Sequence, residues 1–111
     1  WITHNFNLAK HISNKIIIMY GGKIVEFGNK EFILSNPLHP YTKELINISD
    51  YSKYVNKKEL NYIKGDQFSF FDKETNCKFL NRCPINTSAC SISPINFTGD
   101  SKHSVLCIHG K

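Results

Sequence analysis

The sequence has no apolar segment long enough to cross a membrane. A membrane-spanning helix needs about 18 or more consecutive apolar residues. The longest apolar run here is Ile16 to Tyr20. We therefore expect no membrane-spanning helix in this chain.

The chain has very little arginine and no cluster of basic residues. Its net charge is +5, but 13 of its 14 basic residues are lysines spread along the sequence, and Arg82 is the one arginine. Proteins that bind nucleic acid gather basic residues on one face and often add an aromatic stacking motif. Neither pattern is present, so we expect no nucleic-acid partner.

Motifs that bind and hydrolyse a nucleoside triphosphate are also absent. There is no G-x-x-x-x-G-K-[ST] phosphate loop. The segment GGKIVEFGNK, residues 21–30, has glycines and lysines at other spacings and is typical of a hairpin. No acidic pair for magnesium follows a predicted strand. We therefore expect these residues not to hydrolyse ATP by themselves.

What is present suits one small folded unit. Hydrophobic residues make up 41% and charged residues 21% of the sequence, which is an ordinary globular balance. The chain opens with WIT, in which Ile2 and Thr3 are typical of the end of a strand already under way. Because an isolated strand has nothing to pair with, we expect a fragment whose partner strands lie upstream.

After this strand, the first 28 residues predict a helix and a β-hairpin. Apolar residues at helical spacing predict a short amphipathic helix over residues 6–12. The β-branched run 16–20 predicts a buried strand, and Gly21-Gly22 predicts a two-residue turn. The chain then returns as a strand over residues 23–27, which Gly28 ends.

Two further helices follow. Asn29 can cap a helix over residues 31–34, which Asn36-Pro37 ends. Pro40 suits the first position of the next helix. The apolar residues on one face of that helix are Tyr41, Leu45 and Ile48.

Four cysteines occur near the end of the sequence. Their spacing is C-x5-C-x6-C-x16-C, at Cys77, Cys83, Cys90 and Cys107. A disulfide needs α-carbons within about 7 Å of each other. A helix beginning at Pro84 would place Cys90 about 10 Å from Cys83 and prevent that bridge. Other pairings remain open.

Metal ligation is another interpretation of these cysteines. Zinc usually takes close C-x2-4-C pairs, and this sequence has none. An iron–sulfur cubane accepts wider spacings, and Cys83-Pro84 resembles the Cys-Pro that closes ferredoxin motifs. Four unligated, buried thiols are the remaining interpretation. Spacing alone therefore leaves disulfides, a metal or cluster, and unligated cysteines open.

Three stretches together resemble one family. THNFNLAKHISNKIIIMYGGKIVEFG, residues 3–28, resembles the last part of an ABC-transporter ATPase domain: Thr-His-Asp, a helix, an apolar strand, then a hairpin ending Ile-Val-Glu-x-Gly. NPLHPYTKELI, residues 36–46, is similar to the His-Pro-Tyr-Thr signature that begins the C-terminal extension of oligopeptide and dipeptide importer ATPase subunits. The tail is similar to that subfamily's cysteine motif. The matching positions are Cys77, Phe79, Arg82, Cys83, Pro84, Cys90, Pro94, His103, Val105 and Cys107.

The resemblance implies a catalytic role for His4. It matches the switch histidine, which contacts the γ-phosphate of ATP held with Mg²⁺ between two subunits. An imidazole at a strand's carboxyl end can donate to a phosphate oxygen and help to align the attacking water. Asn5 departs from the acidic residue that the family usually has. The contact made by that carboxylate is therefore in doubt, whereas the role of His4 is not.

The resemblance also implies a [4Fe–4S] cluster in the extension, with zinc as the alternative. The ligands would be Cys77, Cys83, Cys90 and Cys107. We expect a structural or regulatory role rather than redox catalysis, because a cluster staples a segment too small for its own core. The signature residues His39, Pro40 and Tyr41 have no evident chemistry. They predict a turn at a helix start, with Tyr41 packed on the core.

The fold class implied is an α/β fragment, namely the end of a P-loop NTPase (ABC ATPase) domain followed by a small irregular α+β cysteine-rich extension. Residues 1–36 would be the end of the nucleotide-binding domain and 37–111 the extension. Within the extension, the polar residues 50–65 predict a linker with a short helix over 57–63.

The function implied is that of a fragment of the ATP-binding, ATP-hydrolysing subunit of an ABC importer for oligopeptides or dipeptides. Its partners would be membrane permeases, a sister ATPase subunit and, indirectly, an extracytoplasmic peptide-binding protein. The subunit would lie peripherally on the cytoplasmic face of the membrane. The ABC signature loop, like the phosphate loop, is absent from these 111 residues, so this fragment should be inactive alone.

Two other functions compete with this one. A self-contained iron–sulfur or zinc-binding interaction module would have no link to ATP, and its residues 1–28 would fold without upstream strands. A small secreted disulfide protein is the third interpretation. The strand, helix and hairpin at the start are not typical of a disulfide scaffold.

Overall fold

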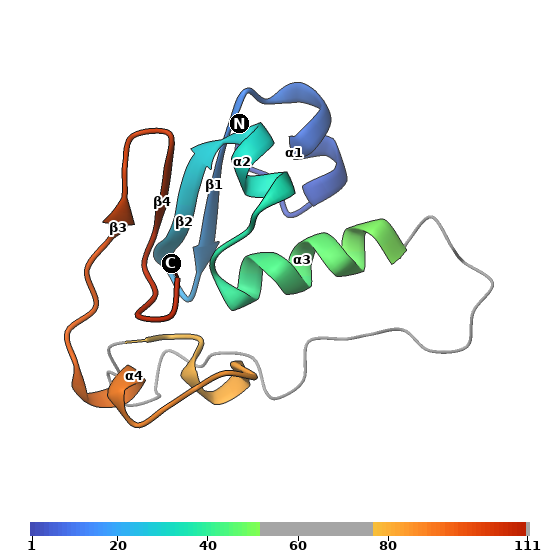
Figure 1. Ribbon diagram of the computed structural model, residues 1–111. Coiled ribbons are helices and arrows are strands. Elements are labelled where there is room, and N and C mark those ends of the chain that lie inside the picture. The colour runs from blue at the N-terminus through green and yellow to red at the C-terminus, as the bar shows by residue number, and fades with distance from the viewer. Residues whose placement is uncertain (52–76, 111) are drawn as a thin grey trace.

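The computed structural model describes residues 1–51 and 77–110 and contains a small antiparallel sheet beside three helices (Figure 1). The strand order is β1-β2-β4-β3, and each neighbouring pair is antiparallel. The three longer helices lie together to one side of the β1–β2 hairpin, and the cysteine-bearing segment lies below them in the view. The chain is therefore a small α/β unit.

The predicted helix after the opening residues is confirmed as α1 (Phe6–Ile12). The side chain of Asn5 caps it by accepting a hydrogen bond from the backbone N–H of Leu8 at 3.1 Å. The predicted strand end at Ile2 and Thr3 is wrong for this structure, because residues 1–3 are extended without strand pairing and Ile2 is fully exposed. No described strand lies beside this segment, and strand structure requires a neighbour.

The predicted hairpin is confirmed as β1 (Lys15–Tyr20) and β2 (Lys23–Asn29). Gly21 and Gly22 have φ values of 54° and 78°. Positive φ at both central residues is the requirement of a type I′ turn, which glycine meets without strain. The β1 strand is buried on one face only, since burial alternates along it. The prediction of a fully buried strand is wrong for Ile17 and Met19, which are 62% and 55% exposed.

The second strand continues one residue beyond Gly28, where the prediction ended it. A side chain at Gly28 would collide with the carbonyl oxygen of Lys102. Glycine is therefore required here to let another part of the chain approach β2 closely. That approaching segment leads into β4 (His103–Val105), which pairs with β2 through Glu26, Phe27 and Gly28.

The next two predicted helices are confirmed as α2 (Lys30–Ser35) and α3 (Pro40–Tyr51). Asn29 stands at the N-cap of α2, although its side chain makes no capping hydrogen bond, and Asn36 ends that helix. Tyr41 of α3 packs against the core, as predicted from the sequence. The α3 helix extends into the predicted linker, and the predicted helix over 57–63 lies outside the described residues.

The C-terminal segment consists of short elements. They are the 3₁₀ helix η1 (Leu80–Arg82), the helix α4 (Ala89–Ile92) and the strands β3 (Thr98–Gly99) and β4. A helix beginning at Pro84 would have separated Cys90 from Cys83, but residues 84–85 form a turn and the helix begins at Ala89. The sequence analysis did not predict β3 or β4.

The core lies between β1, β2 and the helices, and it includes the start of the cysteine segment. Phe79 is buried and sits edge-on to Tyr20, with ring centroids 5.1 Å apart. Tyr41 contacts both rings, at 4.8 Å from Tyr20 and 5.4 Å from Phe79. Arg82 donates to the Tyr20 hydroxyl at 3.3 Å. The aromatic contacts therefore join the hairpin, α3 and the cysteine segment in one core.

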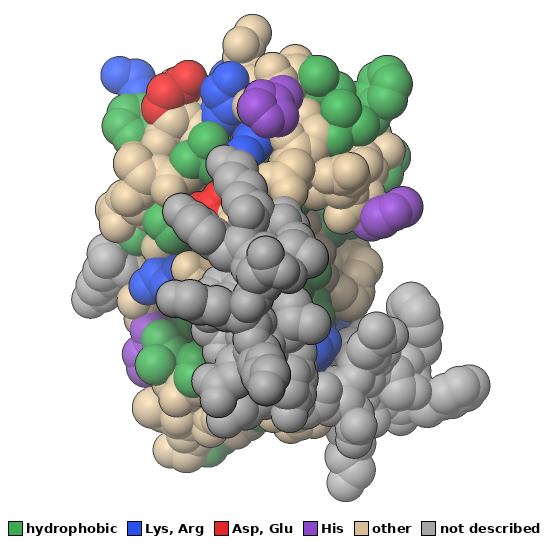
Figure 2. Space-filling view, turned by 90° about the vertical axis from the view of Figure 1, so that its right-hand side faces the viewer, with side chains coloured by type: hydrophobic (Ala, Val, Ile, Leu, Met, Phe, Trp, Pro, Cys, Tyr) green, Lys and Arg blue, Asp and Glu red, His purple; other side chains and the backbone are tan. Residues whose placement is uncertain are grey.

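Basic side chains are dispersed on the surface, as they are along the sequence. On the described part of the face in Figure 2, basic side chains lie scattered among other types. No helix within residues 1–51 and 77–110 is long and apolar enough to cross a bilayer.

Candidate four-cysteine site

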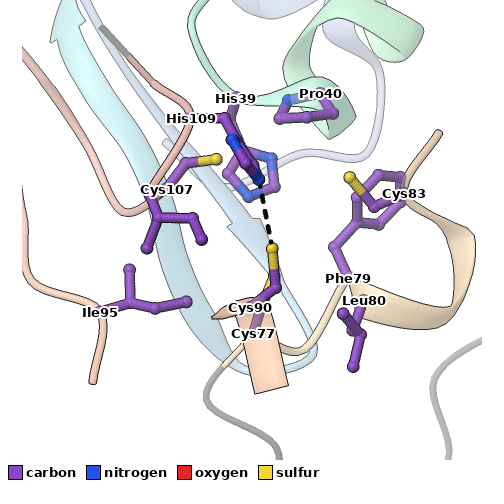
Figure 3. Close-up of a pocket in the computed structure, with 11 residues that line it drawn as sticks. His39, Pro40, Cys77, Phe79, Leu80, Cys83, Cys90, Ile95, Cys107 and His109 are labelled. Carbon is purple, nitrogen blue, oxygen red and sulfur yellow. Dashed lines mark hydrogen bonds between the residues drawn. The ribbon is translucent and has the colours of Figure 1, made fainter. Parts of the chain in front are cut away.

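The four cysteines reach one pocket from four short pieces of chain (Figure 3). Cys77 precedes η1 and Cys83 follows it, Cys90 lies in α4, and Cys107 follows β4. No disulfide joins any of these four thiols, which are all described. The structure therefore brings together all four residues that the sequence analysis grouped by spacing.

Tight turns explain how cysteines that are far apart in sequence meet. The backbone N–H of Cys83 bonds to the carbonyl of Leu80 at 3.3 Å, and the N–H of Cys90 bonds to that of Thr87 at 3.0 Å. Because the chain turns at Pro84 instead of running out as a helix, Cys90 returns to the pocket that Cys83 lines.

Backbone amides point at three of the sulfur atoms. Cys77 receives a hydrogen bond from the backbone of Phe79, and Cys83 receives one from Ile85. The Cys107 sulfur receives two, from His109 and Gly110. N–H groups aimed at sulfur favour the negatively charged thiolate. The sequence does not predict this feature, because it depends on the local backbone conformation.

Burial and the backbone amides act in opposite directions on the pKa of these thiols. Burial raises the pKa of the Cys77, Cys83 and Cys107 thiols, and the other cysteines of the pocket raise the pKa of each further. The backbone hydrogen bonds lower these values but are the smaller effect. A buried set of mutually repelling thiolates needs positive charge nearby. Four such thiols are donors that a cationic metal centre could bind, and its binding would displace the thiol protons.

The walls between the thiols are apolar, and the space is small. The apolar side chains in the lining include Phe79, Leu80, Ile95 and Ile108, and the cavity volume is about 10 Å³, close to what one water needs. Among the described residues, no three His, Cys, Asp or Glu side chains are placed to hold a metal ion. The thiols thus share a pocket without converging on one point.

The arrangement of the four thiols distinguishes between a zinc ion and an iron–sulfur cluster as the group that they could bind. A single zinc ion would require every sulfur at about 2.3 Å from one point. A cubane carries each thiolate on a different iron, so its four sulfur ligands stand further apart. The number and type of donors fit a cluster, although the thiols would have to turn outward from the present cavity to admit one.

Two imidazoles line the same pocket (Figure 3). The exposed His109 has its Nε2 atom 3.5 Å from Cys90 Sγ and 3.4 Å from Thr87 Oγ1. His39 is 1% exposed, and burial lowers its pKa from 6.5 to about 4, with Glu26 opposing the shift more weakly. The sequence analysis gave neither histidine a role.

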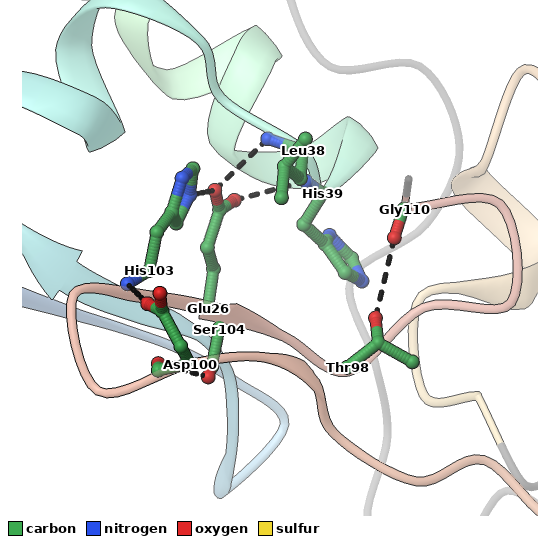
Figure 4. A network of polar contacts seen from close by, with 8 residues as sticks. All are labelled: Glu26, Leu38, His39, Thr98, Asp100, His103, Ser104 and Gly110. Carbon is green, nitrogen blue, oxygen red and sulfur yellow. Dashed lines mark hydrogen bonds and ion pairs between the residues drawn. The ribbon is translucent and has the colours of Figure 1, made fainter.

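A second buried polar site adjoins the pocket through His39 (Figure 4). The Glu26 side chain is completely buried. One of its oxygens, Oε1, accepts from the backbone N–H of Leu38 at 2.9 Å and lies 2.6 Å from His103 Nε2. Its other oxygen accepts from the backbone N–H of His39 at 2.9 Å. Glu26 therefore joins β2, the turn before α3 and strand β4.

The position of His103 in this second site is set by a turn. Asp100 Oδ1 accepts from the backbone N–H groups of Lys102 and His103 at 2.7 and 3.0 Å. These bonds lower the pKa of the Asp100 carboxyl and shape the chain that enters β4. The resemblance marked His103 as part of the cysteine motif, and its contact here is with Glu26.

His4 takes part in neither site: it is not among the described residues that line the cysteine pocket or form hydrogen bonds with Glu26. It is exposed on a bend before α1, and α1 lies at the end of the molecule opposite the cysteine segment (Figure 1). The neighbouring Asn5, which replaces the usual acidic residue, caps α1. Asparagine and aspartate are about equally good at that position, so the departure leaves the start of the helix intact.

Comparison with known proteins gives a family match. Residues 25–90 match the family model described as "Oligopeptide/dipeptide transporter, C-terminal region". The match begins in β2 and ends at Cys90, so it includes the turn around His39 and three of the four cysteines. His4 and Cys107 lie outside it.

Several curated proteins are similar to nearly the whole chain. The oligopeptide transport ATP-binding protein OppF of Salmonella typhimurium is 35% identical over 111 residues, covering 97% of this chain and 33% of the relative. Its Escherichia coli namesake is 34% identical with the same coverage. The dipeptide transport ATP-binding protein DppD of Caldanaerobacter subterraneus is 33% identical over 90 residues, covering 81% and 27%. The chain thus spans about a third of the length of these relatives.

Proposed function

Because the chain belongs to the family of the oligopeptide/dipeptide transporter C-terminal region, we propose that it serves as the carboxyl-terminal part of the ATP-binding subunit of an importer for oligopeptides or dipeptides. The observation that carries this proposal is the family match over residues 25–90. Two relatives named as oligopeptide transport ATP-binding proteins, which each align with 97% of the chain, support it. Neither comparison supports the alternative of a self-contained metal-binding module.

In this proposal, residues 1–36 end a P-loop nucleotide-binding domain and residues 37–111 form the extension. The pairing of β2 with β4 means that the extension also contributes to the sheet of the first part. ATP with Mg²⁺ would bind to the complete subunit, and His4 would contact the γ-phosphate. The exposure of His4 on a bend leaves its imidazole accessible to such a ligand.

The four cysteines would hold a [4Fe–4S] cluster in the extension. A cluster supplies a rigid, multiply bonded centre that ties together segments too short to build their own core. The common pocket, the backbone amides directed at three sulfurs and the apolar walls all support this assignment. A zinc ion is the less suitable occupant, because the thiols do not converge on one point.

The partners in this proposal are two membrane permeases, a sister ATPase subunit and, through the permeases, an extracytoplasmic peptide-binding protein. The subunit would be peripheral, on the cytoplasmic face of the membrane. ATP would close the dimer of ATPase subunits and its hydrolysis would open it. That motion would drive peptide uptake.

A chimera tests this function. The matching third of the Salmonella typhimurium OppF protein is replaced by this chain, and oligopeptide uptake is measured in cells that lack OppF. We expect the chimera to restore uptake and a His4→Ala chimera to lose it, while a His11→Ala chimera behaves as the unmodified one. A chimera that co-purifies with the permeases but supports no uptake would contradict the proposal.

A further inference from the structure

His39 connects the two buried polar sites of the molecule. Its backbone N–H donates to Glu26, while its side chain lines the four-cysteine pocket (Figures 3 and 4). In Figure 4 the imidazole points away from Glu26. The ring is therefore available for a role in the pocket that is separate from the role of the backbone.

The hydrogen bond at one ring nitrogen determines where the ring proton lies. Nδ1 of His39 accepts from the backbone N–H of Tyr41 at 3.1 Å. A neutral imidazole that accepts at one nitrogen carries its proton on the other. His39 is thus an Nε2–H donor, with Nε2 on the ring edge that the Tyr41 amide does not contact.

The ring is held by contacts outside the four cysteines. Phe79 packs against it with a centroid distance of 5.8 Å, and the Tyr41 amide fixes its other edge. Within residues 1–51 and 77–110, the hydrogen bond from Tyr41 is the ring's only one. A preorganised N–H therefore faces a cavity lined by four sulfur atoms.

We propose that His39 is a positioning residue of the four-cysteine site, whose Nε2–H donates a hydrogen bond to a sulfur atom of the centre that these cysteines hold. The inference rests on the cluster assignment made above. Hydrogen bonds to sulfur are among the factors that set the reduction potential of an iron–sulfur cluster. Because the reduced cluster carries more negative charge, a donor stabilises it more than the oxidised form and raises the potential.

The contacts of the ring make it a neutral donor. Nδ1 accepts a hydrogen bond from the Tyr41 amide, and a protonated imidazole has no acceptor nitrogen. The donor would complement the backbone amides already directed at Cys77, Cys83 and Cys107. This function gives the His-Pro-Tyr signature a chemical role. The His39 side chain donates a hydrogen bond to sulfur, and the Tyr41 amide orients that side chain. Pro40 begins α3.

The test is a redox titration of the whole chain, reconstituted without oxygen with iron and sulfide. The wild type is compared with His39→Phe, which removes the donor, and with His39→Gln, whose amide retains one. For His39→Phe we expect the ratio of reduced to oxidised cluster at a fixed poise to fall about tenfold, equal to about −59 mV for a one-electron couple. His39→Gln should stay near the wild type. His11→Gln, on the exposed end of α1, is the matched control and should not shift.

The outcomes separate this inference from the proposed cluster. If the wild type binds no iron and sulfide, the cluster assignment fails and the role of His39 fails with it. If the wild type and His39→Phe both load fully and have the same potential, the cluster stands and the role of His39 is refuted. If His39 has only a structural role, His39→Phe should lower the cluster loading or the stability of the chain. In that case His39→Gln would not bring the reduction potential back to the wild-type value.

A second measurement does not depend on how well the His39 variants fold. The chain is labelled with ¹⁵N-histidine in a His109→Gln background, and the reduced cluster is studied by pulsed EPR. A coupling to a histidine nitrogen and its exchangeable proton supports the inference, because His39 is then the one histidine that lines the pocket among the described residues. Absence of that coupling overturns it.

Discussion

The two buried polar sites that meet at His39 differ in how complete they are. Both oxygens of the Glu26 carboxylate have partners supplied by the chain itself, from Leu38, His39 and His103. The cysteine pocket has four thiols between apolar walls, with backbone amides directed at three sulfurs and no disulfide among the four. The chain itself supplies hydrogen-bond partners for both Glu26 oxygens. The cysteine pocket, in contrast, has four sulfur donors that could bind a metal centre.

This difference separates polar groups that hold a fold together from those that hold a ligand. A buried carboxylate is tolerated when its hydrogen bonds are complete. Buried thiols are tolerated in any case, because a neutral thiol behaves as a small hydrophobe. Neutral thiols therefore need no bound group in the cysteine pocket, and under our proposal they become thiolates when a metal centre binds.

The largest expected effect is on the pocket. Cys83→Ser in the reconstituted whole chain should remove nearly all bound iron and sulfide, which we expect at about four of each per wild-type chain. A serine oxygen is a poor replacement for a thiolate on iron. Iron and sulfide analysis with the visible spectrum measures this. Full loading of Cys83→Ser would show that this cysteine is not a ligand.

The next effect is on the complete site. Glu26→Gln removes the charge and turns one acceptor into a donor that faces the N–H groups of Leu38 or His39. Breaking a buried, hydrogen-bonded charge typically costs about 3–5 kcal/mol. We expect a loss of this size in the free energy of unfolding from urea titration at neutral pH. The matched control, Glu31→Gln on α2, lies on the surface and should change stability by less than about 0.5 kcal/mol.

The third effect is a pH dependence of the unfolding free energy that is caused by His39, the residue that the two sites share. Its folded pKa of about 4 lies below the usual 6.5, so between these values the unfolded chain binds more protons. Stability should therefore fall as pH falls from 6.5 towards 4, by about 2–3 kcal/mol at about pH 4.5. Urea titrations of the metal-free chain at neutral pH and at about pH 4.5 measure this.

The control for that pH effect is His39→Gln, which cannot titrate. It should retain only the pH dependence that other groups cause. If the wild type and His39→Gln lose the same stability between the two pH values, His39 does not carry the effect.

The smallest expected effect is at the rim of the pocket. Thr87 Oγ1 lies 3.6 Å from Cys90 Sγ and 3.4 Å from His109 Nε2, and these distances are long for hydrogen bonds that contribute much. Thr87→Val should therefore change the unfolding free energy of the metal-free chain by less than about 0.5 kcal/mol. A loss of more than about 1 kcal/mol would mean that the pocket, like the Glu26 site, is held together by its own polar contacts.

Local signals account for the elements that were predicted correctly. The hairpin follows from Gly21-Gly22 between two β-rich runs, and the start of α3 follows from Pro40. The structure of residues 84–85 was left open by the sequence, because proline suits a turn as well as a first helical turn, and the chain forms a turn there. The strand expected at residues 1–3 failed because a strand depends on a neighbour that a single stretch of sequence does not specify.

Some residues of the candidate site were identified from the sequence, and others only from the structure. Spacing and resemblance grouped the four cysteines, and the structure places all four at one pocket. Neither signal gave His39 or Glu26 a role. A lone glutamate in a strand ordinarily faces water, and the burial of Glu26 depends on β4 arriving from residues 103–105.

The sequence by itself thus determined the hairpin, the helices α1, α2 and α3 and the set of cysteines, because turn residues, apolar periodicity and helix-start residues act over a few neighbouring positions. Only the tertiary structure decided that β4 would pair with β2, that Glu26 would be enclosed, and that the His39 ring would face four sulfur atoms. Those features join residues up to 77 positions apart, as Glu26 and His103 are. Their formation depends on packing across the whole chain, which no local pattern encodes.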